Sequence, residues 1–265
     1  MQTVIVGGGN MGRSLLGGLL QSGVPAKSLV VIEPGDAARS ALAGFAVTVR
    51  PTLEDSVNQA ETVVLAVKPA TVAALARSLA GRLGPDVLVV SIAAGVTTQA
   101  LTSWLGARPL VRAMPNTPAL VGAGMSVLYA LPATSAAARG RAEAILAAVG
   151  KVAWITDESL MDAVTAVSGS GPAYFFLVME AMELAAVELG LPLELARTLI
   201  QQTALGSALM AKTSAPGPLR AQVTSPGGTT ERAIVTLQTH HLEAAFKAAL
   251  GAATLRSREL AEACR

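Results

Sequence analysis

The stretch Val4-Ile5-Val6-Gly7-Gly8-Gly9-Asn10-Met11-Gly12 places a Gly-x-Gly-x-x-Gly pattern between a short apolar run and a helical pattern. Each of the three glycines has a physical reason in such a turn. Gly7 makes the tight turn, Gly9 lets the backbone approach a pyrophosphate, and Gly12 permits close helix–strand contact. The N-terminus of the following helix offers free N–H groups to phosphates. A turn without a ligand is the alternative, but the position within a β-α-β pattern favours a dinucleotide site.

An acidic residue, Glu33, ends the second apolar run, about where a dinucleotide-binding fold places a carboxylate. Such a carboxylate accepts hydrogen bonds from the adenosine ribose, which favours NAD. It would also repel a 2′-phosphate, unless Arg39 or Arg50 compensates. The alternative is a solvated loop glutamate. The sequence therefore leaves both NADH and NADPH open as cofactors.

Short β-branched runs alternate with amphipathic stretches from residue 1 to about residue 155. Near-continuous apolar strands that alternate with helices predict a parallel sheet covered on both faces. The predicted strands are Thr3–Val6, Leu29–Ile32, Ala46–Val49, Thr62–Val67, Val87–Ile92, Leu110–Ala113, Met125–Leu128 and Lys151–Ile155. The predicted helices among them are Asn10–Ser22, Gly35–Ala43, Leu53–Ala60 and Pro69–Leu83.

The remainder of the chain is helical in pattern, with long segments near Tyr174–Leu189, Leu193–Met210 and His241–Glu262. Gly190–Pro192 and Pro216–Pro218 separate these segments, as turn residues do. We therefore predict an α/β fold with a Rossmann-type dinucleotide-binding domain at 1–155. An all-helical domain would follow at 156–265.

Composition excludes several classes of protein. Of the 265 residues, 52% are hydrophobic and 14% are charged, which is too apolar for a disordered chain. The net charge of +2 and the lack of a basic run argue against a nucleic-acid partner. The apolar stretches fall short of the roughly 20 residues of a membrane span, and no signal-peptide pattern opens the sequence. The single cysteine, Cys264, excludes an internal disulfide framework and favours the cytoplasm. Abundant short aliphatic residues suggest a large buried subunit interface.

Catalytic side chains of the usual kinds are scarce. The two histidines, His240 and His241, are adjacent, and no pattern of histidine and cysteine ligands predicts a metal site. A Ser-His-Asp triad would lack an obvious nucleophile elbow. The chemistry is therefore expected to come mainly from a cofactor that the protein orients.

Three unusual loops follow predicted strands, at the edge where open α/β sheets bind ligands. These loops are Ala66–Pro69, Ser91–Val96 and Arg112–Pro118. Structural alternatives exist for Pro69, which can start a helix, and for Asn116, which can form an Asx turn.

In the helical half, loops of small and hydroxyl residues lead into helices at Ser168–Tyr174 and Thr224–Glu231. Backbone N–H groups and hydroxyls at such a loop suit a carboxylate, although capping alone also uses serine and threonine. We favour an anion site at Ser225–Thr230.

Together these motifs resemble the Δ1-pyrroline-5-carboxylate reductase family. The resemblance covers nearly the whole chain, because GGGNMG, AVKP, SIAAGV, VRAMPNTPA, LMDAVTAVSGSGPAY, ELGLP and TSPGGTT follow in the family's order and spacing. It implies reduction of pyrroline-5-carboxylate to proline by NADH or NADPH. It also implies a Rossmann domain and a helical dimerisation domain, with intertwined homodimers that in many members assemble into decamers.

The resemblance also implies roles for individual residues. The pyrophosphate would be bound by Gly7, Gly9, Asn10, Met11 and Gly12. The path to the nicotinamide would be lined by Ala66, Val67, Lys68, Pro69, Ala93, Ala94, Gly95 and Asn116. The substrate loop would comprise Ser225, Gly227, Gly228, Thr229 and Thr230, with its amides on the carboxylate. Thr230, the catalytic candidate, would hydrogen-bond the imine nitrogen, and Thr165 and Ser170 would lie near the nicotinamide or substrate. In such dimers the partner subunit can supply the substrate loop.

The sequence departs from the family at Glu33-Pro34-Gly35-Asp36, where many relatives carry residues that accommodate a 2′-phosphate. Other functions also remain open. A 3-hydroxy acid dehydrogenase would need a catalytic lysine in the helical half, where Lys212 and Lys247 lie in no suggestive loop. Two further alternative functions are a different imine reductase and a dinucleotide-sensing regulator.

Overall fold

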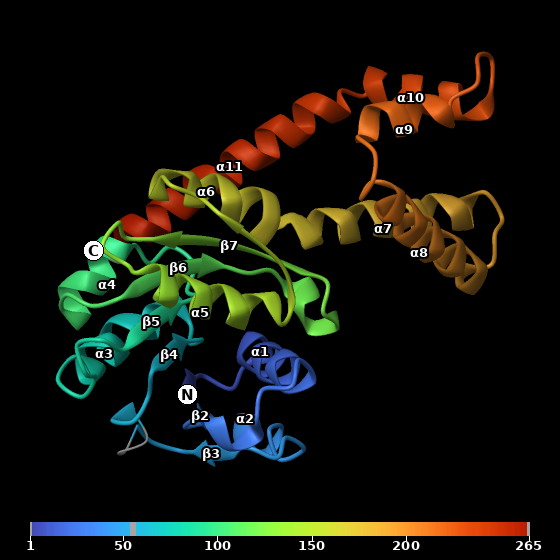
Figure 1. The fold of residues 1–265 in the computed structure, drawn as a ribbon. Coiled ribbons are helices and arrows are strands. Elements are labelled where there is room, and N and C mark those ends of the chain that lie inside the picture. The colour runs from blue at the N-terminus through green and yellow to red at the C-terminus, as the bar shows by residue number, and fades with distance from the viewer. Residues whose placement is uncertain (1, 54–56, 264–265) are drawn as a thin grey trace. The chain divides into compact units, whose positions relative to one another are not determined.

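The computed structural model describes residues 2–53 and 57–263. It divides into two compact units (Figure 1), one formed by Met1–Ser170 with Ala252–Arg265 and the other by Gly171–Gly251. The predicted domain boundary at residue 155 stays a prediction. Cys264 and part of the predicted helix Leu53–Ala60 lie outside the described residues.

The first unit is built on an eight-stranded sheet with the order β3-β2-β1-β4-β5-β6-β7-β8. Its strands are β1 (Thr3–Val6), β2 (Leu29–Ile32), β3 (Thr48–Arg50), β4 (Thr62–Leu65), β5 (Leu88–Ser91), β6 (Leu110–Met114), β7 (Gly124–Ala130) and β8 (Gly150–Trp154). Strands β1 to β6 are parallel, and β1 lies between β2 and β4. The strand order therefore reverses beside β1, which is the switch point where ligands bind in such sheets.

The expectation of a wholly parallel sheet is wrong at its far edge. Strand β7 pairs antiparallel with β6, and β8 pairs parallel with β7. The connection from β6 to β7 spans only residues 115–123, which include the short 3₁₀ helix η3 (Thr117–Val121). A parallel crossover needs about a dozen residues or more, so this short connection forces the chain to turn back.

Alternate residues of the strands supply two separate cores, one on each face of the sheet. In β1, Ile5 packs on one face, and its neighbours Val4 and Val6 pack on the other. The Ile5 face is covered by α1 (Asn10–Gln21) and α5 (Ala136–Ala147), and the opposite face by α3 (Pro69–Ala80) and α4 (Thr98–Leu105). In the central strands β2, β4 and β5 every side chain is removed from water on one face or the other, so these strands are almost wholly apolar.

Among the helices that connect the strands, α2, α4 and α5 differ from the sequence expectation in informative ways. Helix α2 is shorter than predicted, at Asp36–Ser40, and the sequence patterns did not single out α4 or α5. Helix α4 is only eight residues long, so its periodicity is brief. Alanine supplies much of the buried face of α5, including Ala138 and Ala142, which weakens the apolar contrast that reveals a helix.

The second unit contains α7 (Gly171–Glu188), α8 (Leu193–Met210), α9 (Pro216–Gln222) and α10 (Thr229–Thr239). Helix α11 (Leu242–Ala263) continues into the first unit from Ala252. Helices α7 and α8 pack together as a hairpin, and Arg197 of α8 pairs with Glu183 of α7 at 3.2 Å. Among the residues that the structure describes, no helix is long and apolar enough to cross a membrane.

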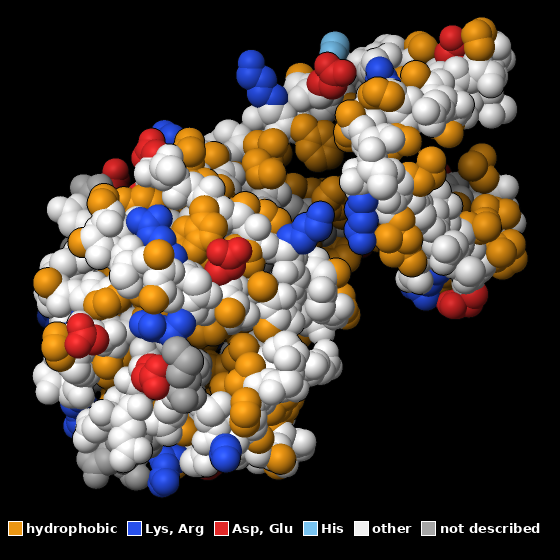
Figure 2. Space-filling model, viewed as in Figure 1, with side chains coloured by type: hydrophobic (Ala, Val, Ile, Leu, Met, Phe, Trp, Pro, Cys, Tyr) orange, Lys and Arg blue, Asp and Glu red, His pale blue; other side chains and the backbone are white. Residues whose placement is uncertain are grey.

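Helix α7 carries exposed apolar side chains around its circumference. The consecutive residues Phe175, Phe176 and Leu177 are 70%, 63% and 63% exposed, and Leu184 and Val187 are also exposed. Figure 2 shows hydrophobic side chains gathered over the surfaces of α7 and α8. A helix that is apolar all round is normally buried, so this surface indicates a protein interface.

Candidate functional site

The glycine turn after β1 has the geometry that a dinucleotide needs. Gly7 adopts a φ of +112°, and a Cβ at this position would lie 2.4 Å from the carbonyl oxygen of Ala66. A Cβ on Gly12 would lie 2.0 Å from the carbonyl oxygen of Gly7. A Cβ on Gly9, by contrast, would have no atom within 4 Å. Gly7 and Gly12 therefore hold the turn close to α1 and β4, and Gly9 faces open space that fits an approaching pyrophosphate.

The carboxylate of Glu33 is held beside this turn by two backbone amides. The N–H of Gly8 donates to Oε2 at 2.7 Å, and the N–H of Gly35 donates to Oε1 at 2.8 Å. The guanidinium of Arg39 donates to the carbonyl oxygen of Glu33 at 2.9 Å and pairs with the side chain of Asp36. Glu33 is thus a fixed negative charge at the end of β2, next to the glycine turn, rather than a free loop residue.

The loops after β4 and β5 combine structural and candidate ligand positions. Lys68 is the N-cap residue of α3 and Pro69 its first residue, so the proline starts a helix as well as lying at the sheet edge. Ala66 donates its N–H to the carbonyl of Val6 at 2.8 Å, which brings the loop against the glycine turn. Gly95 has a φ of +75°, and a Cβ there would meet Leu260 of α11 at 3.4 Å. The Ala93–Gly95 loop therefore lies against the end of α11.

The side-chain amide of Asn116 ties two segments to the end of β6. Its Oδ1 accepts from the N–H of Met125 in β7 at 2.8 Å, and its Nδ2 donates to the carbonyl of Ser168 at 3.2 Å. Ser168 belongs to the π-helical turn η5 (Thr165–Gly169), in which the N–H of Ser170 donates to the carbonyl of Thr165 at 2.8 Å. Such π-helical turns occur frequently at functional sites.

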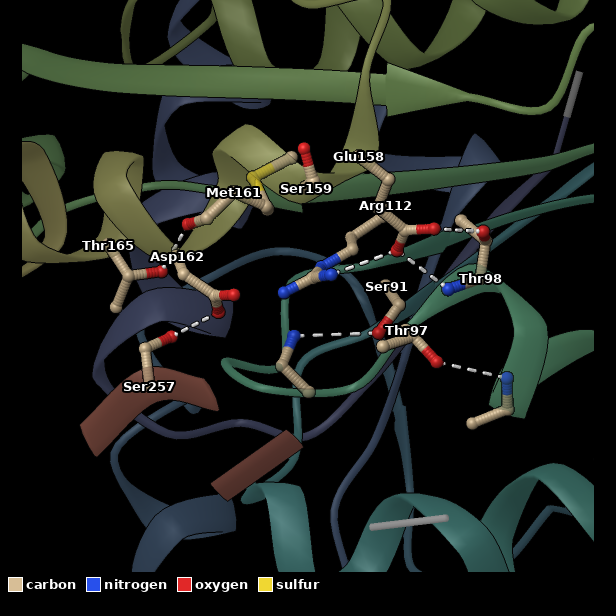
Figure 3. A network of polar contacts seen from close by, with 12 residues as sticks. Ser91, Thr97, Thr98, Arg112, Glu158, Ser159, Met161, Asp162, Thr165 and Ser257 are labelled. Carbon is tan, nitrogen blue, oxygen red and sulfur yellow. Dashed lines mark hydrogen bonds and ion pairs between the residues drawn. The ribbon is translucent and has the colours of Figure 1, made fainter. Parts of the chain in front are cut away.

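A buried ion pair between β6 and the segment after β8 was missed from the sequence (Figure 3). Nη1 of Arg112 donates to Oε1 of Glu158 at 2.8 Å, and the side chains are 5% and 21% exposed. Glu158 lies in the 3₁₀ turn η4 (Glu158–Leu160) and also accepts from the N–H of Thr98 at 2.8 Å and from the Thr98 hydroxyl. The signal was present, because one arginine interrupts an otherwise apolar strand and a buried charge requires a partner.

The same region contains two further polar contacts. The hydroxyl of Ser257 in α11 donates to Oδ1 of Asp162 at 2.7 Å, and Asp162 lies in the short helix α6 (Met161–Val164). Ser159 donates its N–H and its hydroxyl to the carboxylate of Asp157, which lowers the pKa of that carboxyl. These contacts fix the chain between β8 and η5.

The loop Ser225–Gly228 of the second unit is a type II turn that leads into α10. The N–H of Gly228 donates to the carbonyl of Ser225 at 3.0 Å, Pro226 lies between them, and Gly227 has a φ of +74°. The first helical bond of α10 is donated by Arg232 to Gly228, so the preceding N–H groups belong to the free helix N-terminus. That end of α10 suits a carboxylate.

Besides the N–H of Gly228, a second amide of this loop already has a hydrogen-bond acceptor. The N–H of Gly227 donates to Oε2 of Glu231 at 2.7 Å. The N–H of Gly227 therefore stabilises the turn. The backbone N–H groups of Thr229 and Thr230, the first two residues of α10, are better candidates to donate to a substrate carboxylate.

The predicted site residues thus fall into groups. Gly7, Gly12, Ala66 and Glu33 lie around one turn, and Asn116 joins the segment that contains Thr165 and Ser170. The residues of the substrate loop, Ser225 to Thr230, lie together in the second unit. Lys68 and Asn10 are exposed beside the first group, and Val67 is half-buried.

Comparison with known proteins identifies the family. A family model described as pyrroline-5-carboxylate reductase dimerisation matches residues 158–260. One described as NADP oxidoreductase, coenzyme F420-dependent, matches residues 2–95. A protein from Pseudomonas aeruginosa named pyrroline-5-carboxylate reductase is 51% identical over 261 residues, which cover 97% of this chain and 96% of that protein. The chain belongs to the pyrroline-5-carboxylate reductase family.

Solved structures of the family share the fold. A pyrroline-5-carboxylate reductase from Coxiella burnetii is 40% identical, with a TM-score of 0.92 and 98% of each chain covered. A pyrroline carboxylate reductase from Plasmodium falciparum, solved with NADP bound, is 27% identical, with a TM-score of 0.88 and 98% of each chain covered. These likenesses confirm the Rossmann-type fold with a helical C-terminal region, and membership of this family removes the 3-hydroxy acid dehydrogenase alternative. The match to a dimerisation region indicates an oligomer.

Proposed function

We propose that the protein reduces 1-pyrroline-5-carboxylate to L-proline with NADPH or NADH. The observation that supports this proposal most directly is the glycine turn, where Gly9 leaves space for a dinucleotide. The chain's membership of this family supports the choice of substrate. When bound, the reduced nicotinamide supplies the hydride. The turn at Gly7–Gly12 and the first turn of α1 hold the pyrophosphate, and the loops after β4, β5 and β6 line the path toward the nicotinamide.

In this proposal the second unit holds the substrate. The N–H groups at the start of α10 bind the carboxylate, and the hydroxyl of Thr230 hydrogen-bonds the imine nitrogen. A protonated cyclic imine accepts hydride at carbon without an enzymic acid, so orientation is the protein's main contribution. Orientation of this kind is worth roughly 7–11 kcal/mol of an activation barrier.

The direct test is loss of reduced-nicotinamide absorbance when pyrroline-5-carboxylate is added to the protein, run in parallel with NADH and NADPH. Turnover with proline as the product supports the proposal, and no turnover with either cofactor defeats it. The same assay separates the enzyme from a dinucleotide-sensing regulator, which would bind the cofactor without consuming it.

The fixed carboxylate of Glu33 leads to a prediction about cofactor preference. We expect Glu33→Ser to raise the ratio of kcat/KM for NADPH to kcat/KM for NADH about tenfold, or ~1.4 kcal/mol. The substitution removes a negative charge that would repel the 2′-phosphate on the adenosine ribose of NADPH. Asp86→Ser is the matched control, since it removes the same charge from an exposed residue just before β5, at the opposite end of the strands from the glycine turn. An unchanged ratio, or an equal rise in the control, would count against a ribose contact.

The exposed face of α7 leads to a prediction about assembly. We propose a homodimer formed through the helical unit, and a decamer as its higher assembly. Phe176→Ser should weaken the dimer roughly thirtyfold, because truncation of a buried interface aromatic costs about 2 kcal/mol. Analytical ultracentrifugation measures the dissociation constant. Ser78→Glu, at an exposed position of α3, should leave it unchanged. An unaltered constant for Phe176→Ser would place the interface elsewhere.

The cytoplasmic location that cysteine usage favours also belongs to this proposal. Fractionation of cells that express the protein tests it.

A further inference from the structure

Three hydrogen bonds converge on the carboxylate of Glu158 inside the first unit. They come from the guanidinium of Arg112, the backbone N–H of Thr98 and the hydroxyl of Thr98 (Figure 3). Among the ion pairs of the described ranges, this one has the most buried arginine, with its side chain 5% exposed. A buried charge requires a partner, so the pairing with Arg112 holds the Glu158 carboxylate in one orientation.

On one side, Glu158 fixes the beginning of α4. Thr98 is the first residue of this helix, and its N–H has no partner within the helix, so the carboxylate caps it and complements the positive helix end. The loop that precedes α4 is Ser91–Val96, which contains the cofactor candidates Ala93 and Gly95. This loop is therefore held by β5 at its start and by Glu158 just after its end.

On the other side, Glu158 fixes the segment that leads to the π-helical turn. It stands three residues before α6, which runs directly into η5 with its site candidate Thr165. Strand β6 and the loop that follows it anchor this segment at two points, because Arg112 of the strand binds Glu158 and the Asn116 amide of the loop binds Ser168. The chain from Arg112 to Asn116 thus positions both the start and the end of the stretch 158–168.

We propose that Glu158, oriented by Arg112, is a positioning residue for hydride transfer. It sets the spacing between the loop at 93–97 and the segment at 165–170, which face the nicotinamide and substrate in the proposed function on which this inference rests. Glu158 acts through Thr98 and the backbone and has no role in the chemical step itself. A misplacement of about 1 Å in such a site can cost on the order of a hundredfold in rate.

Two variants test the proposal against a matched control. Thr98→Val removes one hydroxyl donor to Glu158 while it keeps side-chain size and the backbone N–H, and Glu158→Gln removes the charge. Thr102→Val makes the same substitution one turn further along α4, where the hydroxyl donates to the carbonyl of Thr98. The measurements are the single-turnover rate of hydride transfer at saturating substrates, the Kd for NADPH, and amide hydrogen exchange of residues 92–100 in the cofactor-free protein.

We expect Thr98→Val and Glu158→Gln to slow hydride transfer roughly tenfold, to change the Kd for NADPH less than about threefold, and to speed exchange in residues 92–100. Thr102→Val should change the transfer rate less than about twofold. Should Glu158→Gln fail to fold, Thr98→Val decides the question alone.

Transfer rates within twofold of the parent in the folded variants would overturn the inference, as would an equal loss in Thr102→Val. Absence of turnover in the parent protein would instead defeat the proposed function. Hydrogen exchange in the cofactor-free protein reports on the loop independently of turnover.

Discussion

Replacement of Gly12 by alanine is expected to abolish tight cofactor binding and to destabilise the protein. The new Cβ would lie 2.0 Å from the carbonyl oxygen of Gly7, so the first turn of α1 must move away from β1. Overpacking of this kind costs about 1–3 kcal/mol of unfolding free energy. Because the turn and the helix N-terminus both bind the pyrophosphate, we expect the Kd for NADPH to rise about a hundredfold or more, or ~2.7 kcal/mol.

Gly9→Ala separates the two effects. A Cβ on Gly9 meets no atom within 4 Å, and the backbone there has a φ of −68°, which alanine adopts freely. We therefore expect unchanged or slightly higher stability, by about 0.4–1 kcal/mol, with cofactor affinity still reduced because the methyl group occupies the pyrophosphate's approach. Chemical denaturation and fluorescence titration with NADPH measure the two quantities. Unaltered affinity in Gly9→Ala would show that the pyrophosphate does not approach this face.

The sequence predicted the sheet well because its strands are buried on both faces. Strands β1 and β2 have the predicted bounds, Thr3–Val6 and Leu29–Ile32, since glycine and acidic residues end the apolar runs abruptly. The reversal at β7 could not be read from an apolar run, because strand direction depends on the length of a connection and on its partner. The short connection at residues 115–123 requires an antiparallel β7 only if β7 is known to pair with β6, and the sequence does not reveal that pairing.

The site was predictable where its residues act through backbone geometry. Gly7 and Gly12 meet the steric requirement that their spacing indicated, whereas the contacts of Asn116 with Met125 and Ser168 depend on tertiary placement. The partner of Arg112 lies 46 residues further along the chain. A lone arginine in an apolar strand predicts that a partner exists, but only the fold brings Glu158 to it.

The second large effect concerns the proposed substrate loop, where Thr230 stands at the second position of α10 and is half-buried. We expect Thr230→Ala to lower kcat/KM for pyrroline-5-carboxylate about 10²–10³-fold, the usual loss when one donor aimed at a reacting polar group is removed. The Kd for NADPH should stay within about twofold, because the glycine turn that binds the pyrophosphate is unchanged.

Two further variants make this prediction specific. Thr230→Ser keeps the hydroxyl and should recover most of the activity, whereas a loss caused by helix packing would persist. Thr236→Ala is the matched control, since its exposed hydroxyl donates to the carbonyl of Arg232 within the same helix. Steady-state kinetics with the imine varied at saturating NADPH measure the effect. If Thr230→Ala retains the parental kcat/KM, the imine nitrogen has another hydrogen-bond partner. The start of α10 would then act only by binding the substrate carboxylate.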